Sequence, residues 1–139
     1  MRGVTAIRCI LIDDRDEEHK IFAEALKETG LPVICHYYHF ADEALQNLYH
    51  RHGPEPKLIF LDINIPRMNG LEFLRKIKII KHLSHIPVYI YSEGKANVQI
   101  NDAMALGAAG YLVKTDDPDE LEALLKKTFG EFLPEKAKH

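Results

Sequence analysis

Short apolar runs alternate with longer amphipathic stretches along this chain, and this alternation limits the possible folds more than any other feature. The runs are rich in β-branched and aromatic residues, as buried strands are, and they cover residues 6–12, 32–38, 58–61, 88–91 and 110–113. The stretches between them space their apolar residues three and four apart, as amphipathic helices do. We therefore predict an α/β fold: a doubly wound, five-stranded parallel sheet flanked by five helices.

Several predicted helices carry signals at their ends. Asp117, Pro118 and Glu120 predict an N-cap, a proline at the first helical position and a capping box. Residues 95–106 hold few large apolar side chains, so we expect the weakest helix there. Glycines that commonly end helices follow three of the stretches: Gly30, Gly53 and Gly130.

Length and composition narrow the class of protein. With 139 residues, 46% of them hydrophobic and 28% charged, we expect one domain over residues 1–130 and a short C-terminal tail over 131–139. The net charge is −3 and no basic stripe stands out among the 18 basic and 21 acidic residues, so we expect no nucleic-acid partner. No apolar run approaches the roughly 20 residues that span a bilayer. We therefore expect a cytoplasmic protein with no membrane segment, and free thiols at Cys9 and Cys35.

Polar side chains follow four of the five predicted strands. Asp13 and Asp14 follow the first strand, Asp62 the third, Ser92 the fourth and Lys114 the fifth. Because parallel strands bring their carboxyl ends to one edge of a sheet, these side chains should lie together. A single aspartate at a strand end can simply cap a turn or a helix. Acids at two strand ends, with a hydroxyl and an ammonium at two others, favour a functional site instead.

The expected cluster has a definite chemistry. Three carboxylates raise one another's pKa unless cations intervene, and Lys114 supplies only one positive charge. Mg²⁺ accepts a few carboxylate ligands and keeps several waters, so it is the predicted cofactor. The ion would also neutralise an incoming phosphoryl group, whose other oxygens Lys114 and Ser92 could hold. Asp62 is then the predicted acceptor, and the product is an acyl phosphate.

The segments "ILIDD", "IFLDINIPRMNG", "IPVYIYS" and "GAAGYLVK" resemble, in this order and spacing, the receiver domain of bacterial two-component response regulators. The resemblance covers roughly residues 6–129 and implies the CheY-like, flavodoxin-like fold. It also implies roles for individual residues: phosphorylation at Asp62, Mg²⁺ ligation by Asp13, Asp14, Asp62 and the backbone carbonyl of Asn64, a catalytic counter-charge at Lys114, a catalytic and switch hydroxyl at Ser92, and a switch aromatic at Tyr111.

The resemblance further implies a stand-alone receiver, not an enzyme, with at most slow self-dephosphorylation. A sensor histidine kinase or a histidine phosphotransfer protein would donate the phosphoryl group. Phosphorylation would draw Ser92 and Lys114 inward and let Tyr111 rotate toward the core, and the weak helix should yield most easily. We therefore expect a downstream protein to bind the face formed within residues 95–129.

Three features depart from the family's pattern. Thr115 follows the lysine where the family usually has a proline in a cis peptide bond. Since a cis bond without proline costs about 3–4 kcal/mol, we expect a trans bond. Glu93 replaces the usual small residue after the switch hydroxyl, and Asn64 and Gly94 occupy positions that tune the phosphate's lifetime.

Three alternatives remain open at this point. A pseudo-receiver would bind partners without being phosphorylated. A haloacid-dehalogenase-type phosphatase would need a second aspartate two residues after the nucleophile, where this chain has Asn64. The histidine-rich runs at 36–39, 50–52 and 82–85 could suggest zinc, but a closed zinc site needs about four ligands, and we interpret these histidines as surface residues.

Overall fold

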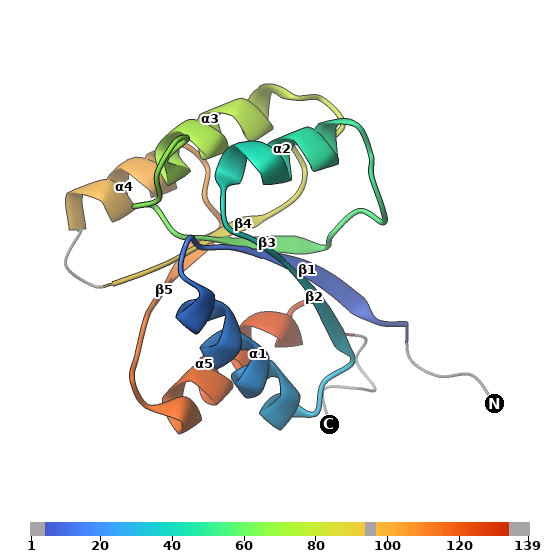
Figure 1. Cartoon of the computed structure of the whole chain (residues 1–139), viewed down its shortest axis with the longest axis vertical. Coiled ribbons are helices and arrows are strands. Elements are labelled where there is room, and N and C mark those ends of the chain that lie inside the picture. The colour runs from blue at the N-terminus through green and yellow to red at the C-terminus, as the bar shows by residue number, and fades with distance from the viewer. Residues whose placement is uncertain (1–4, 94–96, 134–139) are drawn as a thin grey trace.

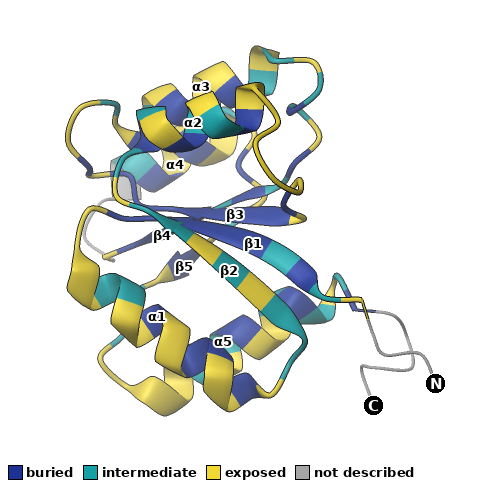
Figure 2. Ribbon diagram, turned by 45° about the vertical axis from the view of Figure 1, so that its right-hand side comes forward, coloured by how far each residue is buried: buried dark blue, intermediate teal, exposed yellow. Residues whose placement is uncertain are grey.

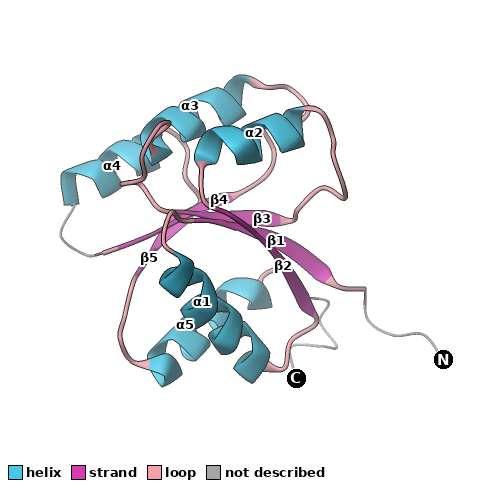
Figure 3. Ribbon diagram, in the orientation of Figure 1, coloured by secondary structure: helices cyan, strands magenta, loops and turns pink. Residues whose placement is uncertain are grey.

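A computed structural model describes residues 5–93 and 97–133, in which strands and helices alternate (Figures 1 and 3). The strands are β1 (Ile7–Ile12), β2 (Val33–Tyr38), β3 (Leu58–Leu61), β4 (Val88–Ser92) and β5 (Gly110–Val113). The helices are α1 (Asp16–Thr29), α2 (Ala41–Tyr49), α3 (Gly70–Ile79), α4 (Asn97–Ala105) and α5 (Pro118–Gly130). Each strand bound differs from its prediction by one residue at most.

The strands form one parallel sheet in the order β2-β1-β3-β4-β5. β1 lies between β2 and β3, so the chain winds outward from β1 in one direction first and then in the other. In sheets of this kind, sites form beyond the carboxyl ends of the strands at the point where the winding reverses. Here that point lies between β1 and β3. The predicted doubly wound parallel fold is confirmed.

Helices cover both faces of the sheet (Figures 1 and 2). We call the face that carries α1 and α5 the α1–α5 side, and the face that carries α2, α3 and α4 the α2–α4 side. The central strands β1, β3 and β4 are almost completely buried, whereas the edge strands β2 and β5 are partly exposed. Each side has its own cluster of buried side chains, so the sheet separates two half-cores.

Aromatic rings fill the half-core on the α1–α5 side. The ring of Phe22 lies 5.1 Å from that of Phe60 and 5.6 Å from that of Tyr91, between ring centres. Phe129 of α5 adds a further ring 5.7 Å from Phe60. Leu133, beyond α5, is buried in the same cluster. Edge-on aromatic contacts of this kind stabilise a core beyond simple burial.

Aliphatic side chains fill the half-core on the α2–α4 side, where Phe73 is the buried aromatic residue of the cluster. Small residues bring α2 and α4 close to the sheet, because Ala41, Ala44 and Ala103 are all buried. Within the described residues, no helix is long and apolar enough to cross a membrane.

Two of the three predicted glycine stops are wrong. Gly30 ends α1 in the left-handed conformation, with φ of 68°, as predicted. α2 instead ends at Tyr49, and Arg51 takes a left-handed conformation (φ 56°) before Gly53 is reached. Gly130 is the last residue of α5, because the chain continues into a turn that brings Leu133 onto the core.

The start of α5 follows the sequence prediction in part. Asp117 is the N-cap, and its carboxylate accepts the backbone N–H of Asp119 at 3.0 Å. The capping box with Glu120 is wrong, because the backbone N–H of Asp117 donates to the hydroxyl of Thr115 at 3.1 Å instead. The Lys114–Thr115 peptide bond is trans, as predicted.

Candidate functional site

Two buried aspartates lie side by side at the carboxyl ends of β1 and β3. The backbone N–H of Asp62 donates to the carbonyl of Ile12 at 3.0 Å, and that of Asp13 donates to the carbonyl of Tyr38 at 3.0 Å. These bonds extend the sheet's hydrogen-bond pattern through both acids. Asp13 is fully buried and Asp62 is 8% exposed. The sheet itself therefore fixes both carboxylates.

Lys114, which follows β5, joins these two acids. Its Nζ donates to Oδ2 of Asp13 at 2.7 Å and to Oδ2 of Asp62 at 3.0 Å. Burial alone would lower the pKa of Lys114, but the hydrogen bond to Asp13 and the charge of Asp62 outweigh it and raise this pKa. The lysine therefore stays protonated.

The carboxylate of Asp62 lacks enough positive charge around it. Burial raises the pKa of Asp62 and so does the charge of Asp13, while Lys114 and the backbone N–H of Asn64, 3.1 Å from Oδ1, oppose the rise. The net pKa shift is upward, which means that the ionised form is disfavoured. A further cation beside Asp62 would reverse this balance.

The side chains expected to bind that cation lie together. Carboxylate oxygens of Asp13, Asp14 and Asp62 lie within 4.8 Å of one another, and Asp14 is exposed while the other two are buried. Three hard oxygen donors with one side open to solvent fit Mg²⁺, which keeps several of its waters. Asn64 lies at the rim, where its side-chain carbonyl accepts a hydrogen bond from Gln99 of α4 at 3.2 Å.

Ser92 and Tyr111 occupy the neighbouring strands. Ser92 is the last residue of β4 and is 2% exposed, and its hydroxyl has no hydrogen-bond partner among the described residues. A buried hydroxyl without a hydrogen bond costs free energy, so a group that entered the site and hydrogen-bonded to Ser92 would be stabilised. Tyr111 pairs with Ile90 across β4 and β5, and its side chain is 53% exposed. Glu93 is exposed, and Gly94 lies outside the described residues.

The loop after Asp62 is held by a close contact with the start of α3. A side chain at Gly70 would place its Cβ 2.7 Å from Cα of Ile63 and 2.9 Å from the carbonyl oxygen of Asp62. Only glycine fits this approach. Asn69 caps the helix by accepting the N–H of Glu72 at 3.0 Å. The sequence "NG" therefore fixes α3 directly against the Asp62 backbone.

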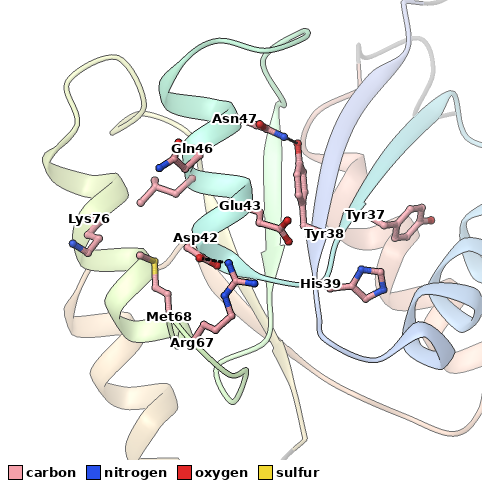
Figure 4. A pocket seen from close by; sticks show the side chains of 11 residues that line it. Tyr37, Tyr38, His39, Asp42, Glu43, Gln46, Asn47, Arg67, Met68 and Lys76 are labelled. Atoms are coloured by element: carbon pink, nitrogen blue, oxygen red, sulfur yellow. Dashed lines mark hydrogen bonds and ion pairs between the residues drawn. The ribbon is translucent and has the colours of Figure 1, made fainter.

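A pocket of about 680 Å³ lies between the end of β2, α2 and the loop that carries Arg67 and Met68 (Figure 4). Arg67 lines this pocket and has a left-handed backbone, with φ of 70°. Its guanidinium lies 4.2 Å from the ring centre of Phe40 and forms an ion pair with Asp42. These contacts offset the backbone cost, which is of order 1–2 kcal/mol for a residue other than glycine.

The sequence did not reveal three residues that contact the site. Glu18 of α1 lies 3.8 Å from Nζ of Lys114, and the buried ring of Tyr91 lies 5.5 Å from the same atom. His19 contacts the carbonyl oxygen of Asp13 through Nε2, at 2.7 Å. Glu18 and His19 reach the site from the first turns of a helix, where acidic residues are expected for reasons of helix stability alone.

The fold and the acidic strand ends place the chain among doubly wound α/β proteins with a site at the switch point of the sheet. The model of the response regulator receiver domain family matches residues 9–126, and the chain belongs to this family. Receiver domains are signalling domains of two-component systems and not enzymes in the ordinary sense.

Individual relatives agree with this assignment. The transcriptional regulatory protein CrdR of Helicobacter pylori is 33% identical over 119 residues, which are 83% of this chain and 53% of CrdR. This chain thus spans about half the length of CrdR. The chemotaxis protein CheY of Pseudomonas aeruginosa is 25% identical over 123 residues, which are 88% of this chain and 96% of CheY. The phosphorylated cyanobacterial phytochrome response regulator RcpA has a TM-score of 0.81 and 26% identity, covering 93% and 94% of the two chains.

Proposed function

We propose that Asp62 accepts a phosphoryl group from a phosphohistidine of a sensor kinase or a phosphotransfer protein, in a Mg²⁺-dependent reaction. The observation that carries this proposal is the partly buried ammonium of Lys114, shared between Asp13 and Asp62. A carboxylate disfavoured by burial, with a fixed cation beside it and an unpartnered hydroxyl at Ser92, suits an incoming anion.

Each group has a defined part in this transfer. An oxygen of Asp62 attacks the phosphorus, the bond from phosphorus to the histidine nitrogen breaks, and the imidazole keeps the electron pair and takes up a proton. Lys114 would move from carboxylate to phosphoryl oxygen without losing its charge, and Ser92 would donate its unused proton. Mg²⁺ held by Asp13, Asp14, Asp62 and the Asn64 carbonyl would neutralise charge on the transferred group.

Labelling with acetyl phosphate and Mg²⁺, followed by Phos-tag electrophoresis, tests the proposal. Wild-type protein should show one slower band, which Asp62→Asn should abolish and Asp14→Ala should weaken by reducing metal affinity. Asp116→Asn is the matched control, because this aspartate is exposed near the same edge and has no part in the site. Stoichiometric labelling of Asp62→Asn, or no labelling of wild type, would overturn the proposal.

We propose further that a downstream protein binds the face formed by residues 95–106, Tyr111 and α5. Residues 95 and 96 lie outside the described part of the chain. Among the residues of α4 whose side chains are described, Ile100 and Ala103 are buried, so a small change in packing can move this helix. The half-exposed Tyr111 ring could rotate inward once Ser92 turns toward the phosphoryl group.

Amide exchange with and without beryllofluoride and Mg²⁺ tests this output face. Exchange rates should change most in α4, β5 and the start of α5, and least in α1 and β2. Equal rates on that face in both states would favour a pseudo-receiver, in which phosphorylation carries no message.

A further inference from the structure

A second cluster of metal-ligating side chains lies beside the acidic site, and the proposed phosphotransfer uses none of them. It consists of Asp16, His19 and His39, which we call the Asp16 cluster. One ligand atom from each lies within 4.8 Å of the other two. Asp16 and His19 are three residues apart on α1, so they share one helix face, and His39 follows β2.

A hydrogen bond to the backbone sets the tautomer of His19 and leaves its other ring nitrogen free for a metal. Its Nε2 lies 2.7 Å from the carbonyl oxygen of Asp13, which can only accept, so Nε2 carries the proton and donates it. In the neutral ring, Nδ1 then keeps its lone pair. Histidines that bind metals commonly fix their second nitrogen on a backbone carbonyl in this way. The rings of Tyr37 and His39 lie against this imidazole, with centres 5.2 and 4.6 Å away.

His39 and Asp16 complete the cluster. Figure 4 shows the His39 ring directed away from Arg67, and its Nε2 hydrogen-bonds to Oδ1 of Asp16. This bond joins the end of β2 to the first residue of α1. Both side chains remain accessible, with exposed fractions of 46% for His39 and 80% for Asp16.

We propose that the Asp16 cluster binds Zn²⁺ through two imidazoles and one carboxylate, with the remaining position open to water. Two ligands on a tetrahedral zinc lie roughly 3.4 Å apart, given metal–ligand distances of about 2.1 Å. The exposed side chains of Asp16 and His39 can close the difference from 4.8 Å by rotating. Mg²⁺ prefers ligand sets made only of oxygen, so the two neighbouring clusters differ in the ion they select.

The proposal does not depend on phosphorylation of Asp62. A zinc ion in this position would link the start of α1 to the end of β2, and His19 would connect it to the backbone of Asp13. The histidine-rich runs in the sequence did not indicate this site, because His19 and His39 come from different elements and only the fold brings them together.

Calorimetric titration of ZnCl₂ into the metal-free chain, prepared without a histidine tag, tests the site. The double variant Asp14→Ala, Asp62→Asn lacks two carboxylates of the acidic site. We expect it still to bind one zinc per chain, in the Asp16 cluster. His39→Gln should weaken this binding about 100-fold or more. His36→Gln is the matched control, because His36 is an exposed histidine of β2, the strand that His39 follows, and it should leave the affinity unchanged.

Further variants keep the outcome decisive. Asp16→Asn should also weaken binding, and it changes an exposed residue that the fold does not need. In ¹⁵N spectra of the histidine rings, zinc should shift Nδ1 of His19 while Nε2 keeps its proton. Equal affinities of His39→Gln and His36→Gln would overturn the proposal. Loss of all zinc binding in the Asp14→Ala, Asp62→Asn background would also overturn it, by assigning the ion to the acidic site.

Discussion

The two sides of the sheet are built differently, although the same strands separate them. On the α1–α5 side, rings contact one another from α1 through β3 and β4 to α5. On the α2–α4 side, aliphatic chains and buried alanines meet the strands, and Phe73 has no aromatic partner among the described residues. The α1–α5 side is therefore a network of contacting aromatic rings, and the α2–α4 side is a mainly aliphatic layer.

This difference indicates which helices can move when the site changes. Lys114 lies against Tyr91, whose ring belongs to the aromatic network, so the network supports the charge that faces Asp62. α4 rests on the aliphatic layer through Ile100 and Ala103. Because few buried side chains of α4 hold it on this layer, we expect α4 to move while the α1–α5 side holds the acids still.

The largest expected effect compares matched phenylalanines on the two sides. Phe22 and Phe73 are both fully buried. Each change to alanine should cost about 3–5 kcal/mol of unfolding free energy. Phe22→Ala should cost about 1 kcal/mol more, since it also removes two ring contacts. Urea unfolding monitored by circular dichroism measures both. A larger loss for Phe73→Ala would contradict the proposed difference between the sides.

Gly70→Ala should reduce both stability and phosphorylation. Its Cβ would meet the backbone of Ile63 and Asp62, which should cost about 1–3 kcal/mol. Displacing Asp62 should also slow labelling by acetyl phosphate about tenfold or more. Gly130→Ala is the control, because no atom lies within 4 Å of its Cβ and alanine favours the helix. The hypothesis is wrong if both variants label at the wild-type rate.

The N-caps of α3 and α5 allow a smaller comparison between the sides. Asn69→Ala and Asp117→Ala each remove one side-chain acceptor for a helix N–H, so each should cost about 1 kcal/mol. Only Asn69→Ala should also slow phosphorylation, because α3 begins against the Asp62 loop. Thermal unfolding and labelling rates distinguish the two. If both substitutions slowed phosphorylation equally, helix stability alone would control the rate of phosphorylation.

The smallest expected effect concerns charge. Burial raises the pKa of Asp62, so the folded protein binds this proton more tightly than the unfolded chain does. The unfolding free energy should therefore fall as the pH rises from about 3.9, the pKa of an unfolded aspartate, through the raised pKa of folded Asp62. Above that pKa the loss of unfolding free energy is complete. Asp62→Asn should raise the melting temperature by a few degrees at pH 7 without Mg²⁺.

That gain should shrink toward pH 4, where Asp62 becomes protonated in both states. Asp116→Asn serves as the control, since this exposed acid lies outside the site. A lower melting temperature for Asp62→Asn at pH 7 would show that the ion pair with Lys114 outweighs the burial cost.

The acidic strand ends were predictable because strand period and parallel pairing together determine which residues share an edge. Asp13, Asp62 and Lys114 each follow a strand directly and Ser92 ends one, so no side-chain geometry was needed to place them together. The predicted capping box at Glu120 is wrong for a local reason: the backbone N–H of Asp117, which Glu120 was expected to accept, donates to the hydroxyl of Thr115 instead. The stop at Gly53 failed because Arg51 adopts the left-handed conformation that glycine was expected to supply.

The sequence by itself determined the order of elements, the parallel sheet and the set of polar groups at its carboxyl edge. Those features follow from periodicity and chain connectivity, which are properties of residues near in sequence. Only the tertiary structure decided that Lys114 bridges Asp13 and Asp62, that Ser92 lacks a partner and that His19 meets His39. Such contacts depend on packing between elements distant in the chain, where side-chain rotamers and burial, and not local pattern, determine which groups meet.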